Sequence, residues 1–162
     1  MAGPERVFVG LGANLGDPAA TVRAALQRLA PLPLTTLIAR SGLYRSAPID
    51  AAGPDYINAV AELRSELSPE DLLRELQALE TAFGRDRPYH HAPRTLDLDL
   101  LLYGQRRIDS ATLRLPHPRL AQRAFVLAPL AELAPAWPLD DGRSVARTLA
   151  ELPEQGLRKI DE

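Results

Sequence analysis

Two aspartates stand two residues apart in the alternating stretch Leu96-Asp97-Leu98-Asp99-Leu100. Residues two apart on a β-strand point to the same face, so both carboxylates would project together while the leucines enter the core. Aspartate is a poor strand former, and the run of leucines that follows is typical of a central strand. The stretch therefore predicts a paired carboxylate site on a largely buried strand.

Two like charges on such a strand require a counter-charge. Mg²⁺ would supply it, because this ion binds one or two carboxylates together with phosphate oxygens and water. A half-exposed strand with two solvated aspartates is the alternative. The spacing alone favours that alternative, whereas the buried character of the strand favours the metal site.

Positive charge gathers in the sequence around the same strand. The residues concerned are Arg85, Arg87, Arg94, Arg114, Arg119, Arg123, His90, His91 and His117. Each one alone would be a solvated loop residue. If two Mg²⁺ ions cancel the charge of a nucleoside triphosphate, however, the group together would balance the two aspartates and the charge that develops during transfer. In phosphoryl-type transfer the protein contributes chiefly by positioning the reactants and stabilising the developing charge. A carboxylate-bound metal beside arginines therefore predicts an Mg²⁺-dependent enzyme that works on ATP.

Gly10, Gly12 and Gly16 lie between a predicted strand and a predicted helix. Their pattern is similar to a dinucleotide-binding fingerprint, but it has one residue too many before the last glycine. In addition, no acidic residue stands suitably at the end of a second strand. A tight turn with close backbone packing is therefore the preferred interpretation.

The composition is that of an ordinary globular protein. The 162 residues are 46% hydrophobic and 25% charged, which fits one domain over residues 1–162. The net charge of −2 and the few aromatic residues argue against nucleic-acid binding. The lack of cysteine excludes disulfides, thiolate zinc sites and a cysteine nucleophile, and it suits a cytoplasmic protein. We expect no secretory signal and no membrane span, and nothing requires more than a monomer.

Strands and helices interleave in the predicted secondary structure. Strands are expected at residues 6–11, 34–44, 56–63 and 96–103, and helices at residues 18–30, 69–83, 122–133 and 144–152. Ser68 should cap the second helix and Gly84 should end it in the left-handed conformation. The order strand–helix–strand–strand–helix–strand predicts an α+β fold with a ferredoxin-like sheet backed by helices. The polar loops at residues 46–55 and 85–95 are long enough to close over substrates.

Five segments in order along the chain carry a family resemblance. They are VGLGANLGD (9–17), LYRSAP (43–48), DYINAV (55–60), PRTLDLDL (93–100), and LPHP with RAFVL (115–118 and 123–127). The PRTLDLD stretch is highly specific on its own. Through these segments, and over nearly its whole length, the chain resembles the 6-hydroxymethyl-7,8-dihydropterin pyrophosphokinases of the folate pathway.

The resemblance implies a ferredoxin-like fold and transfer of pyrophosphate from ATP to the hydroxymethyl group of 6-hydroxymethyl-7,8-dihydropterin, with release of AMP. It implies that Asp97 and Asp99 bind two Mg²⁺ ions and that Arg85 and Arg94 are catalytic. The implied ATP-binding residues are Gln77, Glu80, Arg87, Arg94, Leu100, Arg114, His117 and Arg123. The implied pterin-binding residues are Ser46, Ala47, Ile49, Tyr56, Asn58, His91 and Phe125.

Some positions depart from the family pattern. His91 stands where the family often has a tryptophan. Thr112 and Arg114 stand where some members have arginine and threonine in the opposite order, so a phosphate contact would move to Arg114. Pro118 replaces a tyrosine of some members. These departures bear on single ATP or pterin contacts and leave the implied reaction unchanged.

Two other functions share parts of the pattern. One is a ferredoxin-like module that binds a small molecule or RNA without chemistry, against which the paired aspartates and the lack of a basic, aromatic sheet face argue. The other is a nucleotidyl- or phosphotransferase with a different acceptor. It would share the metal site but not the pocket of Tyr56, Asn58 and Phe125.

Overall fold

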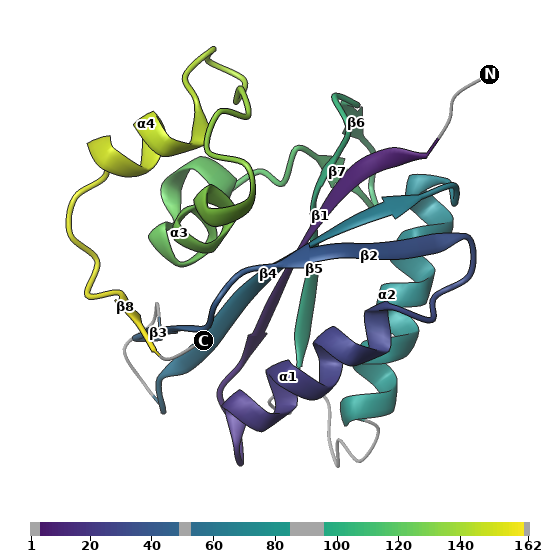
Figure 1. Cartoon of the computed structure of the whole chain (residues 1–162), viewed down its shortest axis with the longest axis horizontal. Coiled ribbons are helices and arrows are strands. Elements are labelled where there is room, and N and C mark those ends of the chain that lie inside the picture. The colour runs from purple at the N-terminus through teal and green to yellow at the C-terminus, as the bar shows by residue number, and fades with distance from the viewer. Residues whose placement is uncertain (1–3, 49–52, 85–95, 161–162) are drawn as a thin grey trace.

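An antiparallel sheet forms the centre of the fold (Figure 1). The computed structural model describes residues 4–48, 53–84 and 96–160. Within these ranges the main sheet has six strands in the order β5-β1-β4-β3-β8, and β2 also pairs with β4. The strands are β1 (Glu5–Ala13), β2 (Thr35–Arg40), β3 (Tyr44–Ser46), β4 (Tyr56–Ser65), β5 (Asp97–Tyr103) and β8 (Arg158–Lys159). A separate hairpin pairs β6 (Ile108–Asp109) with β7 (Arg114–Leu115).

Helices cover both faces of this sheet (Figure 1). α1 (Pro18–Leu29) and α2 (Pro69–Gly84) lie on one face, and α3 (Ala124–Leu133) and α4 (Val145–Glu151) lie on the other. The strand order β5-β1-β4-β2, with α1 and α2 as the crossovers, is the ferredoxin-like arrangement, so the predicted fold is confirmed. None of the helices in the described ranges has the length and apolar character that a membrane span requires.

Each face of the sheet packs into its own hydrophobic core. Val7 and Val9 of β1 pack with Leu76 of α2 in the core beneath α1 and α2. Phe8, which stands between them, points the opposite way and packs with Leu127 of α3 in the second core. A strand that is buried on both faces reads as a continuous apolar run, which explains the sequence of β1.

The burial pattern of β5 changes half-way along the strand, from alternating to continuous, because the strand contains a β-bulge. Its pairing with β1 places Phe8 opposite Leu102 but Val9 opposite Leu100, so Leu101 is an extra residue. Leu100 packs in the core beneath α1 and α2, whereas Leu101 and Leu102 both pack in the core beneath α3. The first half of β5 is therefore free to carry polar residues on the α3 face, while the second half is buried on both faces.

The prediction of one strand over residues 34–44 is wrong, because the chain forms β2 and β3 separately. The break lies at Ser41, whose hydroxyl accepts a hydrogen bond from the backbone N–H of Val60 at 2.9 Å. This side-chain bond takes the place of a backbone carbonyl, so the main chain leaves the ladder for residues 41–43. β3 then rejoins β4 and also pairs with β8, a strand that the sequence did not predict.

Some element ends also differ from the prediction. α2 begins at Pro69 as expected, with the Ser68 hydroxyl accepting from the backbone N–H of Asp71 at 3.1 Å. However, α2 includes Gly84 as its last residue, so the predicted left-handed stop at this glycine is wrong. The helix expected from residue 122 begins at Ala124, because residues 120–122 form a 3-10 turn.

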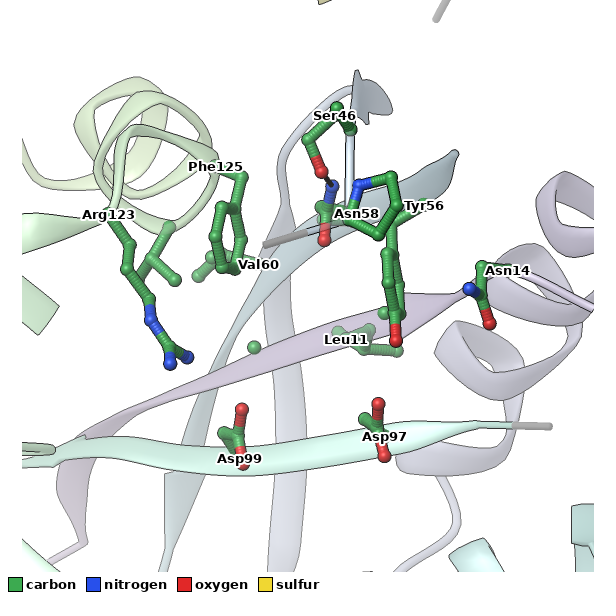
Figure 2. A pocket seen from close by; sticks show the side chains of 16 residues that line it. Leu11, Asn14, Ser46, Tyr56, Asn58, Val60, Asp97, Asp99, Arg123 and Phe125 are labelled. Carbon is green, nitrogen blue, oxygen red and sulfur yellow. Dashed lines mark hydrogen bonds between the residues drawn. The ribbon is translucent and has the colours of Figure 1, made fainter. Parts of the chain in front are cut away.

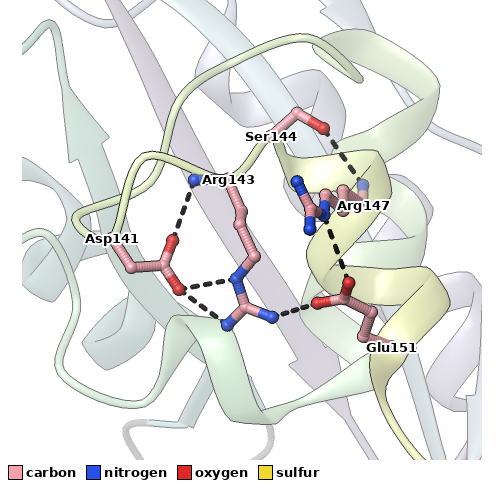
Figure 3. Close-up of polar contacts among 5 residues, drawn as sticks. All are labelled: Asp141, Arg143, Ser144, Arg147 and Glu151. Carbon is pink, nitrogen blue, oxygen red and sulfur yellow. Dashed lines mark hydrogen bonds and ion pairs between the residues drawn. The ribbon is translucent and has the colours of Figure 1, made fainter.

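A small polar network holds α4 and the turn before it (Figure 3). Ser144 caps the helix by accepting from the backbone N–H of Arg147 at 3.1 Å. Arg143 pairs with Asp141 at 2.6 Å and also with Glu151, and Arg147 pairs with Glu151 at 3.2 Å. Because these side chains are solvated, the network orders the turn but adds little to the stability of the protein.

Candidate active site

A cavity of ≈ 330 Å³ opens on the α3 face of the sheet. Its floor consists of β1, β4 and β5, and its walls come from the end of β3 and the start of α3 (Figure 2). Eight of the predicted site residues line it: Ser46, Ala47, Tyr56, Asn58, Asp97, Asp99, Arg123 and Phe125. The fold therefore brings together predicted residues from four separate segments of the chain.

Asp97 and Asp99 enter this cavity from β5 (Figure 2). The leucines beside them point into the opposite core, so the predicted alternation with both carboxylates on one face is confirmed. In the register with β1, Asp97 lies opposite Gly12 and Asp99 lies opposite Gly10. The absence of side chains at these glycines leaves room beside the carboxylates.

The two carboxylates fit a hard divalent cation. Asp97 is half-buried and Asp99 is exposed. Across the described ranges, no group of three or more His, Cys, Asp or Glu residues could hold a metal ion. Mg²⁺ suits a pair of carboxylates, because it keeps water and substrate phosphates as its other ligands, whereas structural zinc needs four protein ligands. The donor set therefore fits a cation that substrate oxygens help to hold.

Gly10 and Gly12 form part of the cavity floor. Gly10 lies inside β1, as the expected strand over residues 6–11 has it. Gly12 lies inside β1 too, so the predicted turn at this glycine is wrong, whereas Gly16 has the positive φ, 62°, of a turn. The close packing that was predicted does occur at Gly12. A Cβ atom there would lie 3.4 Å from Oδ1 of Asn58 and 3.8 Å from Cδ2 of Tyr56.

Replacement of Gly12 by alanine is expected to raise the KM for the ligand of this cavity about tenfold. The methyl group would stand in the cavity beside the Asn58 amide, and crowding a fitted site costs about 1–3 kcal/mol. Gly10→Ala is the matched control on the same strand. Its methyl group would contact the apolar Leu101 side chain at 3.4 Å and neither Asn58 nor Tyr56, so we expect a smaller change. Steady-state kinetics and thermal melts of both variants would test this, and an equal effect of the two substitutions would contradict it.

Aromatic rings lie on opposite sides of the cavity. Tyr56 of β4 and Phe125 of α3 flank it, and Asn58 stands between them (Figure 2). Asn58 is only 5% exposed, and its Nδ2 donates to Oγ of Ser46 at 2.8 Å. A flat heterocycle with a polar edge would fit such a site, with the rings on its faces and the amide at its edge.

The phenol of Tyr56 keeps its proton. Burial raises the pKa of Tyr56 above its usual value of 10.0, and the carboxylate of Asp97 raises this pKa further. The hydroxyl is therefore neutral at physiological pH. It adds no further negative charge beside the two aspartates.

A second cavity, of ≈ 310 Å³, shares Asp99 with the first. The predicted ATP-binding residues Leu100, Arg114 and His117 line it. Thr112 lines it as well, so both positions of the exchanged arginine–threonine pair face the same space. The two cavities thus meet at a carboxylate, which is an arrangement suited to two substrates that react with each other.

His117 is placed as a neutral hydrogen-bond donor in the second cavity. Its Nδ1 accepts from the backbone N–H of Arg119 at 3.2 Å, so the ring proton resides on Nε2. Burial lowers the pKa of His117 below its usual 6.5; Asp99 acts against this, and Arg123 and Arg119 lower the pKa further. A neutral imidazole at pH 7 can donate to a phosphate or ribose oxygen.

The other predicted ATP-side residues have different surroundings. Gln77 lies on the exposed side of α2. Glu80 accepts from the backbone N–H of Leu98 at 2.8 Å, and so ties α2 to β5 between the two aspartates. Arg123 lines the first cavity, with its guanidinium 5.4 Å from the centre of the Phe125 ring. The remaining predicted residues, Ile49, Arg85, Arg87, His91 and Arg94, lie outside the described residues.

Asn14 lines the first cavity, although no role was predicted for it. It follows β1, and its Nδ2 donates to the backbone carbonyl of Pro54 at 3.3 Å. This bond joins the loop before α1 to the segment that leads into Tyr56. The only sequence signal was its place in the segment VGLGANLGD, because an asparagine in a glycine-rich loop is also an ordinary turn residue.

A family model, described as 7,8-dihydro-6-hydroxymethylpterin-pyrophosphokinase (HPPK), matches residues 8–135 of the chain. This span contains all of the residues that line the two cavities. The chain belongs to the HPPK family. The family predicted from five sequence segments is therefore confirmed, and the chain is an enzyme of the pyrophosphokinase class.

Relatives of high identity carry the corresponding enzyme name. A 2-amino-4-hydroxy-6-hydroxymethyldihydropteridine pyrophosphokinase of Pseudomonas aeruginosa is 46% identical over 157 residues, which are 96% of this chain and 97% of the relative. One from Synechocystis sp. is 45% identical over 147 residues, which are 91% of this chain and 74% of the relative.

Solved HPPK-DHPS structures share the fold. One HPPK-DHPS in complex with substrates superposes with a TM-score of 0.75 at 10% identity, and the match covers 92% of this chain and 43% of that chain. A Plasmodium falciparum HPPK-DHPS matches with a TM-score of 0.73 at 11% identity, over 91% of this chain and 45% of that chain. The chain thus spans less than half the length of these solved proteins, and the likeness concerns the fold of that part.

Proposed function

We propose that the chain transfers pyrophosphate from ATP to the hydroxymethyl group of 6-hydroxymethyl-7,8-dihydropterin, which gives AMP and the pterin diphosphate in folate biosynthesis. The observation that carries the proposal is the pair of cavities that meet at Asp99. One is flanked by aromatic rings with an amide between them, and the other is lined by His117 and Arg114. A pterin suits the first and a nucleotide suits the second.

The pterin would lie between Tyr56 and Phe125. Asn58, held by Ser46, would read the polar edge of the ring, and Ala47 would contribute to the same wall. Stacking on two rings fixes the plane of the pterin, while the amide fixes its rotation in that plane. Ile49 and His91, which lie outside the described residues, are proposed to complete this pocket.

Asp97 and Asp99 would hold two Mg²⁺ ions together with phosphate oxygens. When bound, such ions neutralise charge on the triphosphate and on the group being transferred. Two observations support this role: both carboxylates project into the first cavity, and Asp99 also lines the second. The fixed floor of β1 beneath them reduces the reorganisation needed during the reaction.

The remaining residues would bind and orient the triphosphate. His117 would donate through Nε2, and Arg114 and Arg123 would supply positive charge, with Leu100 forming an apolar surface. Glu80 and Gln77 would act from α2. Arg87 is proposed as a further ATP ligand, and Arg85 and Arg94 as the catalytic arginines that stabilise the charge of the transferred group.

In the proposed reaction the hydroxymethyl oxygen of the pterin attacks the β-phosphorus of ATP. The bond between that phosphorus and the oxygen that bridges to the α-phosphate breaks, AMP leaves with this oxygen, and the hydroxyl proton passes to solvent. The chain contributes by holding the two reactants in contact and by excluding water. We propose a monomeric enzyme in which residues 1–162 act as one domain. The cytoplasmic location stays a prediction.

Product analysis tests this function. The protein is incubated with ATP, Mg²⁺ and 6-hydroxymethyl-7,8-dihydropterin, and the nucleotides are separated by chromatography. We expect AMP that depends on the pterin, disappears when EDTA removes the metal and returns when Mg²⁺ is restored in excess. ADP as the product would instead indicate a phosphotransferase, and no turnover by folded protein would indicate a binding module.

A further inference from the structure

The two walls of the pterin cavity come from distant parts of the chain. The end of β3 supplies Ser46 and Ala47, and the start of α3 supplies Phe125 and Val126. Some 80 residues separate these segments in the sequence, so their spacing in the fold depends on contacts made elsewhere. The width of a cavity that takes a flat ring is set by that spacing.

Glu132, near the end of α3, links this helix to the start of β3. Its Oε1 accepts from the backbone N–H of Gly42 at 3.0 Å, and its Oε2 accepts from the hydroxyl of Tyr44. Lys159 of β8 approaches the same Oε2 at 3.2 Å, and its ammonium group lies 5.9 Å from the centre of the Tyr44 ring. One carboxylate thus joins three elements: α3, β3 and β8.

Tyr44 continues the link to the cavity. It is 8% exposed, and it pairs with Asn58 in the register of β3 and β4. The side chain of Asn58 in turn donates to Ser46 on the same strand, two residues beyond Tyr44. A displacement of Tyr44 would therefore move both the wall at Ser46 and the amide that faces the pterin.

We propose that Glu132 is a positioning residue for pterin binding, which holds α3 and β3 at the separation that the flat ring requires. The inference rests on the proposed function, because it assigns Glu132 a part in binding that substrate. Glu132 lies outside the cavity lining, so it acts through Tyr44, Gly42 and the helix that carries Phe125. Apolar packing of α3 against the sheet remains without it, so the fold should survive its loss.

The chemistry of the link makes it selective for a carboxylate. Two donors, an amide and a phenol, approach separate oxygens, and an ammonium group adds a charge-assisted contact. Glutamine would retain one acceptor oxygen but would direct an NH₂ group at the other donors. Burial and the bond to Glu132 both raise the pKa of Tyr44, so the phenol remains a donor at physiological pH.

Equilibrium binding of the reduced pterin, measured by fluorescence, tests the inference together with steady-state kinetics. For Glu132→Ala we expect the Kd and KM for the pterin to rise about tenfold, the size of one lost charge-assisted hydrogen bond, with the KM for ATP and kcat changed less than about threefold. For Glu132→Gln, the Kd and KM for the pterin should fall between those of Glu132→Ala and the wild type. Tyr44→Phe should also raise the Kd and KM for the pterin. The variant that combines Glu132→Ala with Tyr44→Phe should raise them by less than the product of the two single effects.

Glu151→Gln is the matched control. It removes a carboxylate at the end of α4 that pairs with Arg147 on the same helix and with Arg143 in the turn before it, and it does not line the cavity. It should leave both KM values unchanged. The inference is overturned if Glu132→Ala leaves pterin affinity within twofold of wild type, or if pterin and ATP parameters worsen together in step with a lower Tm. A wild-type protein that binds pterin but forms no AMP would overturn the proposed reaction and leave the binding comparison intact; one that binds no pterin overturns both.

Discussion

Substitution of Asp97 or Asp99 by asparagine is expected to lower kcat about a thousandfold, because the loss of a metal ligand removes several kcal/mol of charge stabilisation. The fold should remain intact. Both side chains point into a cavity rather than into a core, and each substitution removes one of two like charges on the same strand. AMP formation measures the first effect, and thermal melts followed by circular dichroism measure the second.

Asp71→Asn serves as the control for this experiment. Asp71 is an exposed carboxylate in the first turn of α2 that pairs with Arg74, so its loss should leave kcat unchanged. A kcat above one third of the wild-type value in either cavity variant would mean that the carboxylate pair is not the metal site. A thousandfold loss with an unchanged melting curve is the result that the structure predicts.

Replacement of Asn58 by alanine should raise the KM for the pterin roughly 10- to 100-fold while the KM for ATP stays within about twofold of the wild type. The substitution removes the amide that would read the ring and leaves the Ser46 hydroxyl without its donor at 2.8 Å. Loss of one partner in a buried hydrogen bond costs about 1–3 kcal/mol, which corresponds to this range of affinity. Steady-state kinetics with each substrate varied in turn would measure it.

Ser41→Ala provides a comparison of similar chemistry. Ser41 is buried, and its hydroxyl accepts from Val60 on the same strand as Asn58, but it does not line the cavity. This control should lower Tm without changing either KM, whereas Asn58→Ala should change the pterin KM more than Tm. Equal KM changes in the two variants would contradict a direct role for Asn58 in binding.

Local patterns were sufficient to predict the chemistry on β5. The alternation of aspartate and leucine has a period of two, so the sequence alone places both carboxylates on one face of a strand. The cap at Ser68 is equally local, since it depends on residues three positions apart. The helix and strand order then leads to the ferredoxin-like sheet, which the structure confirms.

Features that depend on distant pairing were missed. Ser41 interrupts a predicted strand because its hydroxyl meets Val60, nineteen residues away, and no local pattern marks it. The short strand β8 forms because its backbone pairs with the edge strand β3, more than a hundred residues earlier in the chain. The sequence around Gly12 is compatible with both a turn and a strand, so the prediction ends the strand one residue before it. Only the register opposite the aspartates shows why a side chain is absent there.

The alternation of aspartate and leucine ahead of the bulge in β5 restricts the registers that this strand can adopt beside β1. Ahead of the bulge, one face of the strand carries carboxylates and the other carries leucines packed beneath α1 and α2. If β5 shifted by one residue along β1, both aspartates would point into that core. Burying each charge there would cost several kcal/mol. The residues proposed to bind metal thus also disfavour the wrong strand register, because a sheet with that register would bury their charges and lose stability.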